Sequence, residues 1–294
     1  MKYRTLAKLF KSSELKKISA GDFETVRSLR DSCSELCETE TMADVYNKAY
    51  SLLLSNYRNE YVVKNEIANK ILLGRHSMNT ASMLSELRTG ANIADCVVIN
   101  GISTCYEIKT EFDSLTRLQD QLNSYLKAYD KTFVVVHSSH LQQVKTIYKT
   151  TPTFGILELT KRNQLKKIVE APISKNFDFD ITFETLRKAE YIFIAKQVLG
   201  EIPDMPNTSI YEYCKQAYKS LSVQEANAIF KESLKKFRNN DHIFINSLPK
   251  SMKNVGISYQ LKRHEKNNLL SSLMNKTITT GDNNVLPIHE RKAP

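Results

Sequence analysis

Residues 93–109 read IADCVVINGISTCYEIK, and this stretch decides the fold of the chain. Two apolar runs flank an Asn-Gly pair, a dipeptide that favours a hairpin turn. The first run begins at Asp95, and the second ends in Glu107-Ile108-Lys109. A two-residue turn would place Asp95 opposite Tyr106, whereas a three-residue loop or a bulge places it opposite Glu107 on one face. If both carboxylates serve one site, the longer loop or a bulge is required, and we predict it.

The residue types at the two ends of this hairpin suit a hard cation and a phosphate. Mg²⁺ prefers oxygen ligands and takes one or two protein carboxylates, leaving room for waters and phosphate oxygens. Lys109 follows Glu107 by two residues, so the alternation of a strand places both side chains on one face. An ammonium there can hold an attacking water or stabilise developing negative charge. The pattern predicts a metal-dependent nuclease.

The order of periodic segments around the hairpin indicates an α/β fold. Helical spacing covers residues 1–55 and 60–73, and Gly74 is expected to end the second helix. The elements expected next are strands at 82–87, 94–99 and 104–109, a helix at 114–129 capped by Asp113, a strand at 133–136, a helix at 139–148, and a hairpin at 154–159 and 165–169. This order predicts a mixed central β-sheet flanked by helices, with helical additions at both ends.

Composition and helix-breaking residues divide the sequence into four expected segments. These are an N-terminal helical segment (1–55), the α/β core (56–202), a basic helical C-terminal module (203–276) and a flexible tail (277–294). Pro203, Pro206 and Asn207 mark the expected joint between the core and the basic module. The five cysteines are scattered and odd in number, so we expect reduced thiols.

The formal charge of +10 is unevenly placed, with 22 basic against 14 acidic residues in 161–294. Such a surplus suits a polyanion, although a solvated helical surface is the ordinary alternative. The basic residues that we expect to contact nucleic acid are Lys235, Lys236, Arg238, Lys262, Arg263 and Arg117. No run approaches the roughly 18 apolar residues of a membrane span. The start of the chain shows no signal-peptide core, so a cytoplasmic location without membrane contact is expected.

The residues Asp95 and Glu107-Ile108-Lys109 around a hairpin resemble the PD-(D/E)XK nuclease superfamily. The longer pattern is similar to the sce7726 group of bacterial proteins within it, over roughly residues 58–200. The strings that carry this likeness are SELRTG (85–90), IADCVVIN (93–100), YEIK (106–109), DSLTRL (113–118) and QLNSY (121–125). A departure is Ala94, where the motif has proline.

The resemblance implies a restriction-endonuclease-like core in which Asp95, Glu107 and the carbonyl of Ile108 bind Mg²⁺ or Mn²⁺. It implies that Lys109 stands beside the nucleophilic water. A further acidic residue is expected from the first helix or the preceding strand, either Glu66 or Glu86, and Glu86 is favoured. Gln121 and Tyr125 fall where related nucleases carry a Gln-x-x-x-Tyr element near the site.

The function predicted from these residues is DNA hydrolysis, with a role in phage defence or mobile-element DNA processing implied by the resemblance alone. The alternative is a non-catalytic module on the same fold that binds nucleic acid or protein as the subunit of a defence or toxin complex. The presence of Asp95, Glu107 and Lys109 together favours the enzyme. Apolar residues in the helical ends leave room for a protein partner in either case.

Overall fold

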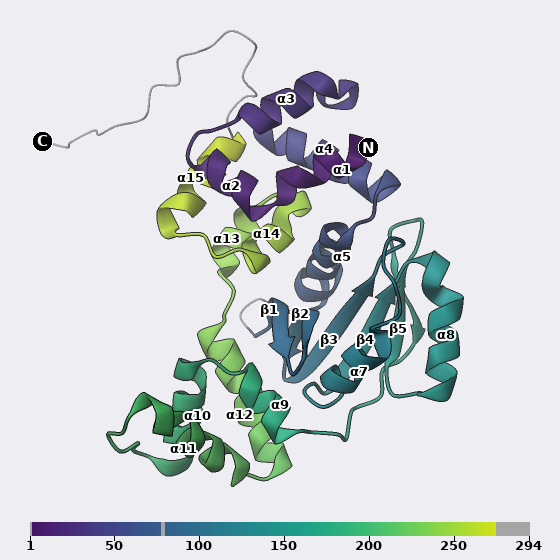
Figure 1. Cartoon of the computed structure of the whole chain (residues 1–294). Coiled ribbons are helices and arrows are strands. Elements are labelled where there is room, and N and C mark those ends of the chain that lie inside the picture. The colour runs from purple at the N-terminus through teal and green to yellow at the C-terminus, as the bar shows by residue number, and fades with distance from the viewer. Residues whose placement is uncertain (1, 78–79, 275–294) are drawn as a thin grey trace, which may run out of the picture. The chain divides into compact units, whose positions relative to one another are not determined.

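The computed structural model describes residues 2–77 and 80–274. The chain divides into two compact units, one formed by residues 1–49 with 261–294 and the other by residues 50–260. We call them the helical unit and the sheet unit and describe each by itself. Figure 1 shows the elements of both along the chain.

The helical unit joins the start of the chain to its last described helix. Its elements are α1 (Lys2–Leu6), η1 (Ala7–Phe10), α2 (Ser12–Ser19), α3 (Glu24–Ser32), η2 (Ser34–Leu36), the first half of α4 (Met42–Asn56) and α15 (Arg263–Met274). Helices α2 and α15 pack together, and Asn268 of α15 donates a hydrogen bond to the carbonyl of Ser19. Leu15 and Leu269 are fully buried. The predicted helical N-terminal segment is therefore confirmed, with α15 as part of its core.

The centre of the other unit is one mixed six-stranded sheet in the order β1-β2-β3-β4-β5-β6. The strands are β1 (Ser82–Thr89), β2 (Asn92–Asn100), β3 (Ile102–Lys109), β4 (Lys131–Val136), β5 (Gly155–Leu159) and β6 (Leu165–Val169). β3, β4 and β5 run parallel, and the other neighbouring pairs are antiparallel. The expected mixed α/β core and every expected strand are confirmed.

Helices cover both faces of this sheet because its strands are apolar on both sides. Val97 and Ile99 of β2 join a core with α7 (Leu118–Tyr125), whereas Cys96 and Val98 join a core with α5 (Glu60–Ile67). Val134 and Val136 of β4 pack with α7 and α8 (Leu141–Thr150). Alternate residues of one strand therefore enter different cores, as the period of two requires. Glu107, two residues after Cys105, belongs to the face that α7 covers.

A glycine sits where the sheet leaves no space for a side chain. A Cβ on Gly155 would lie 2.3 Å from the ring of Phe133 in the neighbouring strand. That ring in turn stacks against Tyr106, with centroids 5.8 Å apart. The close approach of β5 to β4 therefore depends on glycine at this position.

Two helices differ from their predicted bounds. The helix that begins with α5 passes through the π-helical segment η3 (Ala68–Leu72) into α6 (Leu73–Arg75), so Gly74 lies inside it. α7 begins only at Leu118, because Asp113 does not cap a helix. Its carboxylate instead accepts hydrogen bonds from the N–H and hydroxyl of Thr110, which fixes a turn after β3.

The helices after the sheet belong to the same unit as the sheet, not to a module of their own. They are α9 (Phe179–Thr185), α10 (Lys188–Leu199), α11 (Asn207–Lys219), α12 (Val223–Phe237), α13 (His242–Ser247), η5 (Lys250–Met252) and α14 (Lys253–Ser258). Tyr191, Cys214 and Phe230 from these helices share one buried cluster with Val97 of β2. The expected joint near Pro203 and Pro206 is thus a break between packed helices. The expected tail from residue 277 lies outside the described residues.

None of the described helices combines the length and the apolar composition that a membrane span requires.

Candidate active site

The hairpin at the centre of the site has the predicted longer connection. Ile99 pairs with Ser103 and Asn100 with Ile102, so the chain turns at Gly101, which has a φ of +72°. The same register pairs Cys96 with Tyr106. The predicted longer connection is therefore confirmed. Continued by one residue, this register would set Asp95 opposite Glu107, and the negative charge of Glu107 does raise the pKa of Asp95.

Asp95 is held at the open end of the hairpin by a backbone group. Its Oδ2 accepts a hydrogen bond of 2.7 Å from the N–H of Ile108. Burial, together with the negative charges of Glu107 and Glu60, raises the pKa of Asp95 to about 8. A carboxylate with so high a pKa gains strongly from a nearby cation.

Glu107 and Lys109 form a buried ion pair on β3. Nζ of Lys109 lies 2.8 Å from Oε1 of Glu107 and 2.9 Å from Oε1 of Gln121. The other carboxylate oxygen, Oε2 of Glu107, is buried and has no hydrogen-bond partner among the described residues. Burial raises the pKa of Glu107, and Lys109 opposes that shift. One oxygen of Glu107 is therefore fixed, while the other needs a partner.

The helix α7 supplies the two further side chains predicted near the site. Gln121 reaches Lys109 as described, so the structure brings it into the site. Tyr125 is fully buried and donates its hydroxyl proton to the carbonyl of Ile93, at 2.7 Å. A phenol has one proton to donate, and here it anchors the start of β2. The same hydroxyl lies close enough to the carboxylate of Glu107 to lower the pKa of that group.

The backbone of Ile108 is directed toward Asp95. The N–H of Ile108 donates to Asp95, whereas the carbonyl of Lys109 accepts from His137 on the β4 side. In a strand the N–H and C=O of one residue point to the same neighbour. The carbonyl of Ile108 therefore faces the Asp95 side, as the proposed ligand role requires.

A second buried lysine, which the sequence did not single out, lies beside Asp95. Lys64 of α5 contacts Glu60 at 2.5 Å and Glu86 at 3.3 Å. Although burial alone opposes its charge, the carboxylate of Glu60 raises the pKa of Lys64, so it remains a cation. Glu86 lies opposite Asp95 in the register of β1 but adopts a φ of +55° and keeps its side chain 70% exposed. The favoured acidic candidate thus faces Lys64.

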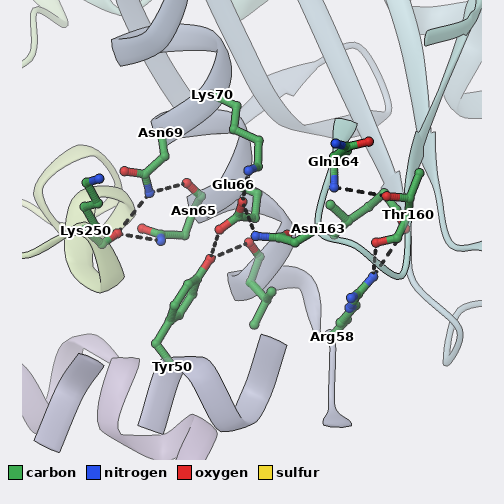
Figure 2. A network of polar contacts seen from close by, with 12 residues as sticks. Tyr50, Arg58, Asn65, Glu66, Asn69, Lys70, Thr160, Asn163, Gln164 and Lys250 are labelled. Atoms are coloured by element: carbon green, nitrogen blue, oxygen red, sulfur yellow. Dashed lines mark hydrogen bonds and ion pairs between the residues drawn. The ribbon is translucent and has the colours of Figure 1, made fainter. Parts of the chain in front are cut away.

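The other acidic candidate, Glu66, is committed elsewhere. Figure 2 shows its carboxylate among Tyr50, Asn163 and Lys70. Tyr50 donates to Oε1 at 2.5 Å, Asn163 donates to Oε2 at 2.9 Å, and Lys70 lies 3.0 Å from Oε2. One oxygen therefore joins α5 to Tyr50 of α4, and the other joins it to the turn between β5 and β6. The acidic side chain of this helix that influences Asp95 is Glu60.

The donor set fits a hard divalent cation. Asp95, Glu107 and the Ile108 carbonyl offer oxygen atoms, the type that Mg²⁺ and Mn²⁺ prefer. The partnerless Oε2 of Glu107 supports such a ligand, since a buried oxygen without a partner is costly. No group of three or more His, Cys, Asp or Glu side chains within residues 2–77 and 80–274 is placed to enclose a metal. The site is thus a two-carboxylate arrangement, in which water and substrate would have to supply the remaining ligands of a cation.

The predicted nucleic-acid contacts separate into different environments. Lys235 and Lys236 of α12 line a hollow of about 470 Å³ against Ile99 and Gly101 of the hairpin, and Nζ of Lys236 lies 4.1 Å from the ring centroid of Phe193. Arg117 is exposed just before α7. Lys262 and Arg263 are exposed in the helical unit, which also holds α15.

Arg238 is a correction to that list. Its guanidinium donates to both oxygens of Glu190, at 2.5 and 2.6 Å, and to the carbonyl of Thr185 at 2.8 Å. The side chain is 10% exposed. A buried bidentate pair of this kind holds α10 against the end of α12 and leaves no donor face for a phosphate.

Glu60 and Lys64 could have been found from helical spacing. They lie four residues apart and so share one face of α5, and Asn59 caps the helix by accepting from the N–H of Val62 at 3.3 Å. Glu66 lies six residues after Glu60, which places it on a different side of the same helix.

Comparison with known proteins gives one family. The family model described as Bacteriophage P4 protein cII matches residues 53–260. That stretch runs through nearly the whole sheet unit and includes the carboxylate site. No curated protein and no solved structure matches the chain.

Proposed function

The chain belongs to the bacteriophage P4 protein cII family, and we propose that its sheet unit is a metal-dependent nuclease that hydrolyses phosphodiester bonds of DNA. One observation carries the proposal: buried Glu107 has one oxygen held by Lys109 and the other without a partner among the described residues. Asp95 lies close enough to Glu107 for that charge to raise its pKa. Because the family description names a bacteriophage protein, we place the activity in the processing of mobile-element DNA.

The residues that would hold Mg²⁺ or Mn²⁺ are Asp95, Glu107 and Ile108, the last through its carbonyl. A bound cation of this kind polarises the scissile phosphate and acidifies a water. Glu86 contacts Lys64, so in the proposal it acts through that lysine and not as a direct ligand.

Lys109 has the geometry to serve the reacting atoms. Its ammonium carries three N–H donors, of which Glu107 and Gln121 take two. The third remains for a water or a phosphate oxygen. Because the side chain is fixed at both partners, its charge is already in place when negative charge develops on the phosphate. Gln121 is in this scheme a positioning residue.

Lys235 and Lys236 beside the hollow would bind the phosphate backbone of DNA independently of its base sequence. Along β2 the hollow lies about six residues from Asp95, or roughly 20 Å at the rise of a strand. On DNA that length corresponds to about six base steps of 3.4 Å. One molecule of DNA can therefore reach both the carboxylates and these lysines.

The proposal is tested with purified full-length protein and supercoiled plasmid in Mg²⁺ or Mn²⁺. Glu107→Gln removes the charge of the buried carboxylate and keeps its shape. Glu170→Gln is the matched control, since Glu170 is a surface carboxylate that is paired with Lys131 and Lys167. We expect metal-dependent nicking or linearisation by the wild type and by Glu170→Gln, and none by Glu107→Gln or in EDTA.

Two outcomes would overturn the proposal. One is equal cleavage by the wild type and Glu107→Gln, which would place any activity elsewhere or in a contaminant. The other is a folded wild type that leaves both the plasmid and single-stranded DNA intact with both metals.

A further inference from the structure

Two aromatic side chains lie together on the segments that lead into and out of the site. The ring centroids of Tyr57 and Phe112 are 4.8 Å apart, with an angle of 35° between the planes. Phe112 is 49% exposed. A single exposed aromatic residue needs no special explanation, but this pair is notable for its position.

Both rings are carried by anchored backbone. Phe112 follows Lys109 by three residues, within the turn that Asp113 and Thr110 fix. Tyr57 precedes Glu60 by three residues, and its N–H donates to the carbonyl of Leu53 at 2.7 Å. Arg58, the next residue, donates to the carbonyl of Thr160 at 2.5 Å (Figure 2). It also donates to the carbonyl of Lys161 at 2.8 Å. The two rings, which we call the aromatic platform, are therefore held in place by the backbone of both segments.

The charges near the rings suit a polyanion. Lys161 and Arg162 are exposed in the turn to which Arg58 binds, and Arg117 is exposed before α7. Glu111 is exposed next to Phe112, whereas the carboxylate of Asp113 is occupied by Thr110. Three exposed cations thus stand against two exposed carboxylates along these segments, and one of the two, Glu60, is paired with Lys64.

We propose that Tyr57 and Phe112 stack an unpaired nucleobase, so that the substrate is single-stranded or locally unpaired nucleic acid. Aromatic side chains beside a basic track are the means by which proteins bind single strands without sequence preference. In a duplex the faces of the bases are covered by their neighbours, and a ring at the protein surface cannot reach them. The inference rests on the proposed function for the position of the scissile phosphate.

The absence of tryptophan from the chain allows a direct test. Phe112→Trp in a Glu107→Gln background introduces a single reporter at the platform without cleavage. The probes are a 12-nucleotide single strand and the blunt duplex of the same sequence. We expect the single strand to quench the tryptophan fluorescence and the duplex to leave it nearly unchanged. Phe112→Ala should weaken single-strand binding by about 5- to 100-fold.

Ile243→Trp and Ile243→Ala serve as matched controls, because Ile243 is 70% exposed on α13. The fluorescence of Ile243→Trp should not change when the single strand is added, and Ile243→Ala should bind the single strand as tightly as its parent. Equal quenching by duplex and single strand, unchanged affinity in Phe112→Ala, or no binding of the single strand by the wild type would overturn the inference. Plasmid cleavage without quenching would leave the nuclease standing and remove the platform. Quenching without any cleavage would support base stacking on the two rings and contradict the nuclease.

Discussion

Nζ of Lys109 lies 2.8 Å from Oε1 of Glu107, although only one residue separates the two along β3. The alternation of the strand makes this possible, because residues two apart project from one face. The contact neutralises one oxygen of a buried carboxylate, whereas the other oxygen is buried without a hydrogen-bond partner among the described residues. The lysine therefore both orients a ligand and presents its own charge.

Removal of the Lys109 charge should slow cleavage without abolishing metal binding. Lys109→Met keeps the length of the side chain, and we expect the rate of plasmid nicking to fall by about 10²–10³. The dependence of the rate on Mg²⁺ concentration should keep its midpoint within a few-fold. Lys127→Met is the control, since Lys127 is 49% exposed. A rate within threefold of the wild type would remove Lys109 from the mechanism.

Gln121 should act through Lys109 and not on the substrate. Gln121→Ala frees the ammonium, and we expect a roughly tenfold loss in rate, within the usual effect of a positioned catalytic group. Gln121→Glu retains an acceptor and should recover most of the rate. Gln119→Ala on the same helix is the control, because Gln119 contacts only Asn123 among the described residues. If the Ala and Glu variants were equally impaired, the positioning role would be wrong.

Strand alternation explains why the fold could be predicted from the sequence. Val97 and Val98 enter cores on opposite faces, and a run apolar on both faces is typical of a covered strand. The start of α7 was mispredicted because Asp113 can cap a helix or close a turn, and the local sequence does not decide between them. The separate C-terminal module was mispredicted for another reason. Cys214 and Phe230 pack with sheet residues that are more than a hundred positions away, and no local pattern shows this.

Some residues of the candidate site could likewise be predicted from the sequence, and others could not. Asp95, Glu107 and Lys109 were predicted because one hairpin carries them, and their register follows from its connection. Glu60 and Lys64 were missed because they come from another element. Arg238 resembled a free cation until the structure placed Glu190, 48 positions earlier, against it.

Asp95 should make the metal-free protein less stable as the pH rises. Its folded pKa is about 8 against 3.8 for the free group. Between these values the unfolded chain releases a proton that the folded state retains, so stability falls with pH across this window. Asp95→Asn removes the effect. In EDTA we expect its melting midpoint to exceed that of the wild type by roughly 3–8 °C at pH 8, but by about 1 °C or less at pH 4.

Addition of Mg²⁺ at pH 8 should reverse this order, because the cation stabilises only the ionised carboxylate. The measurement is thermal unfolding followed by circular dichroism. A wild type and an Asp95→Asn variant whose curves run parallel from pH 4 to 8 would show that Asp95 ionises normally.

Glu66 should contribute to stability and not to catalysis. Glu66→Ala removes the carboxylate that accepts hydrogen bonds from Tyr50 and Asn163 in the network of Figure 2. We expect a loss of about 2–4 kcal/mol in the free energy of unfolding. The surface pairs of Glu170 should be worth about 0.5 kcal/mol or less in Glu170→Ala. Urea unfolding measures both, and nicking activity per folded molecule should be unchanged in Glu66→Ala. A variant of normal stability that has lost activity would return Glu66 to the site.

Substitution of Lys235 and Lys236 should weaken DNA binding and leave stability unchanged, whereas substitution of Arg238 should lower the stability of the fold. Lys235 and Lys236 are the cations that we expect on phosphate, so the double alanine variant should lower the slope of log affinity against log salt by about 2. Its stability should remain near that of the wild type. Arg238→Ala leaves Glu190 buried without its partner and should cost about 3–5 kcal/mol of folding free energy.

Fluorescence anisotropy of labelled DNA in a NaCl series, with Glu107→Gln as the background, measures the slopes. Lys149→Ala on α8 is the control, since Lys149 is exposed away from the hollow. Parallel salt plots for the background and the double variant would exclude α12 from the DNA path. A folded Arg238→Ala with a reduced slope would instead restore Arg238 as a phosphate contact, because the loss would then be one of charge and not of structure.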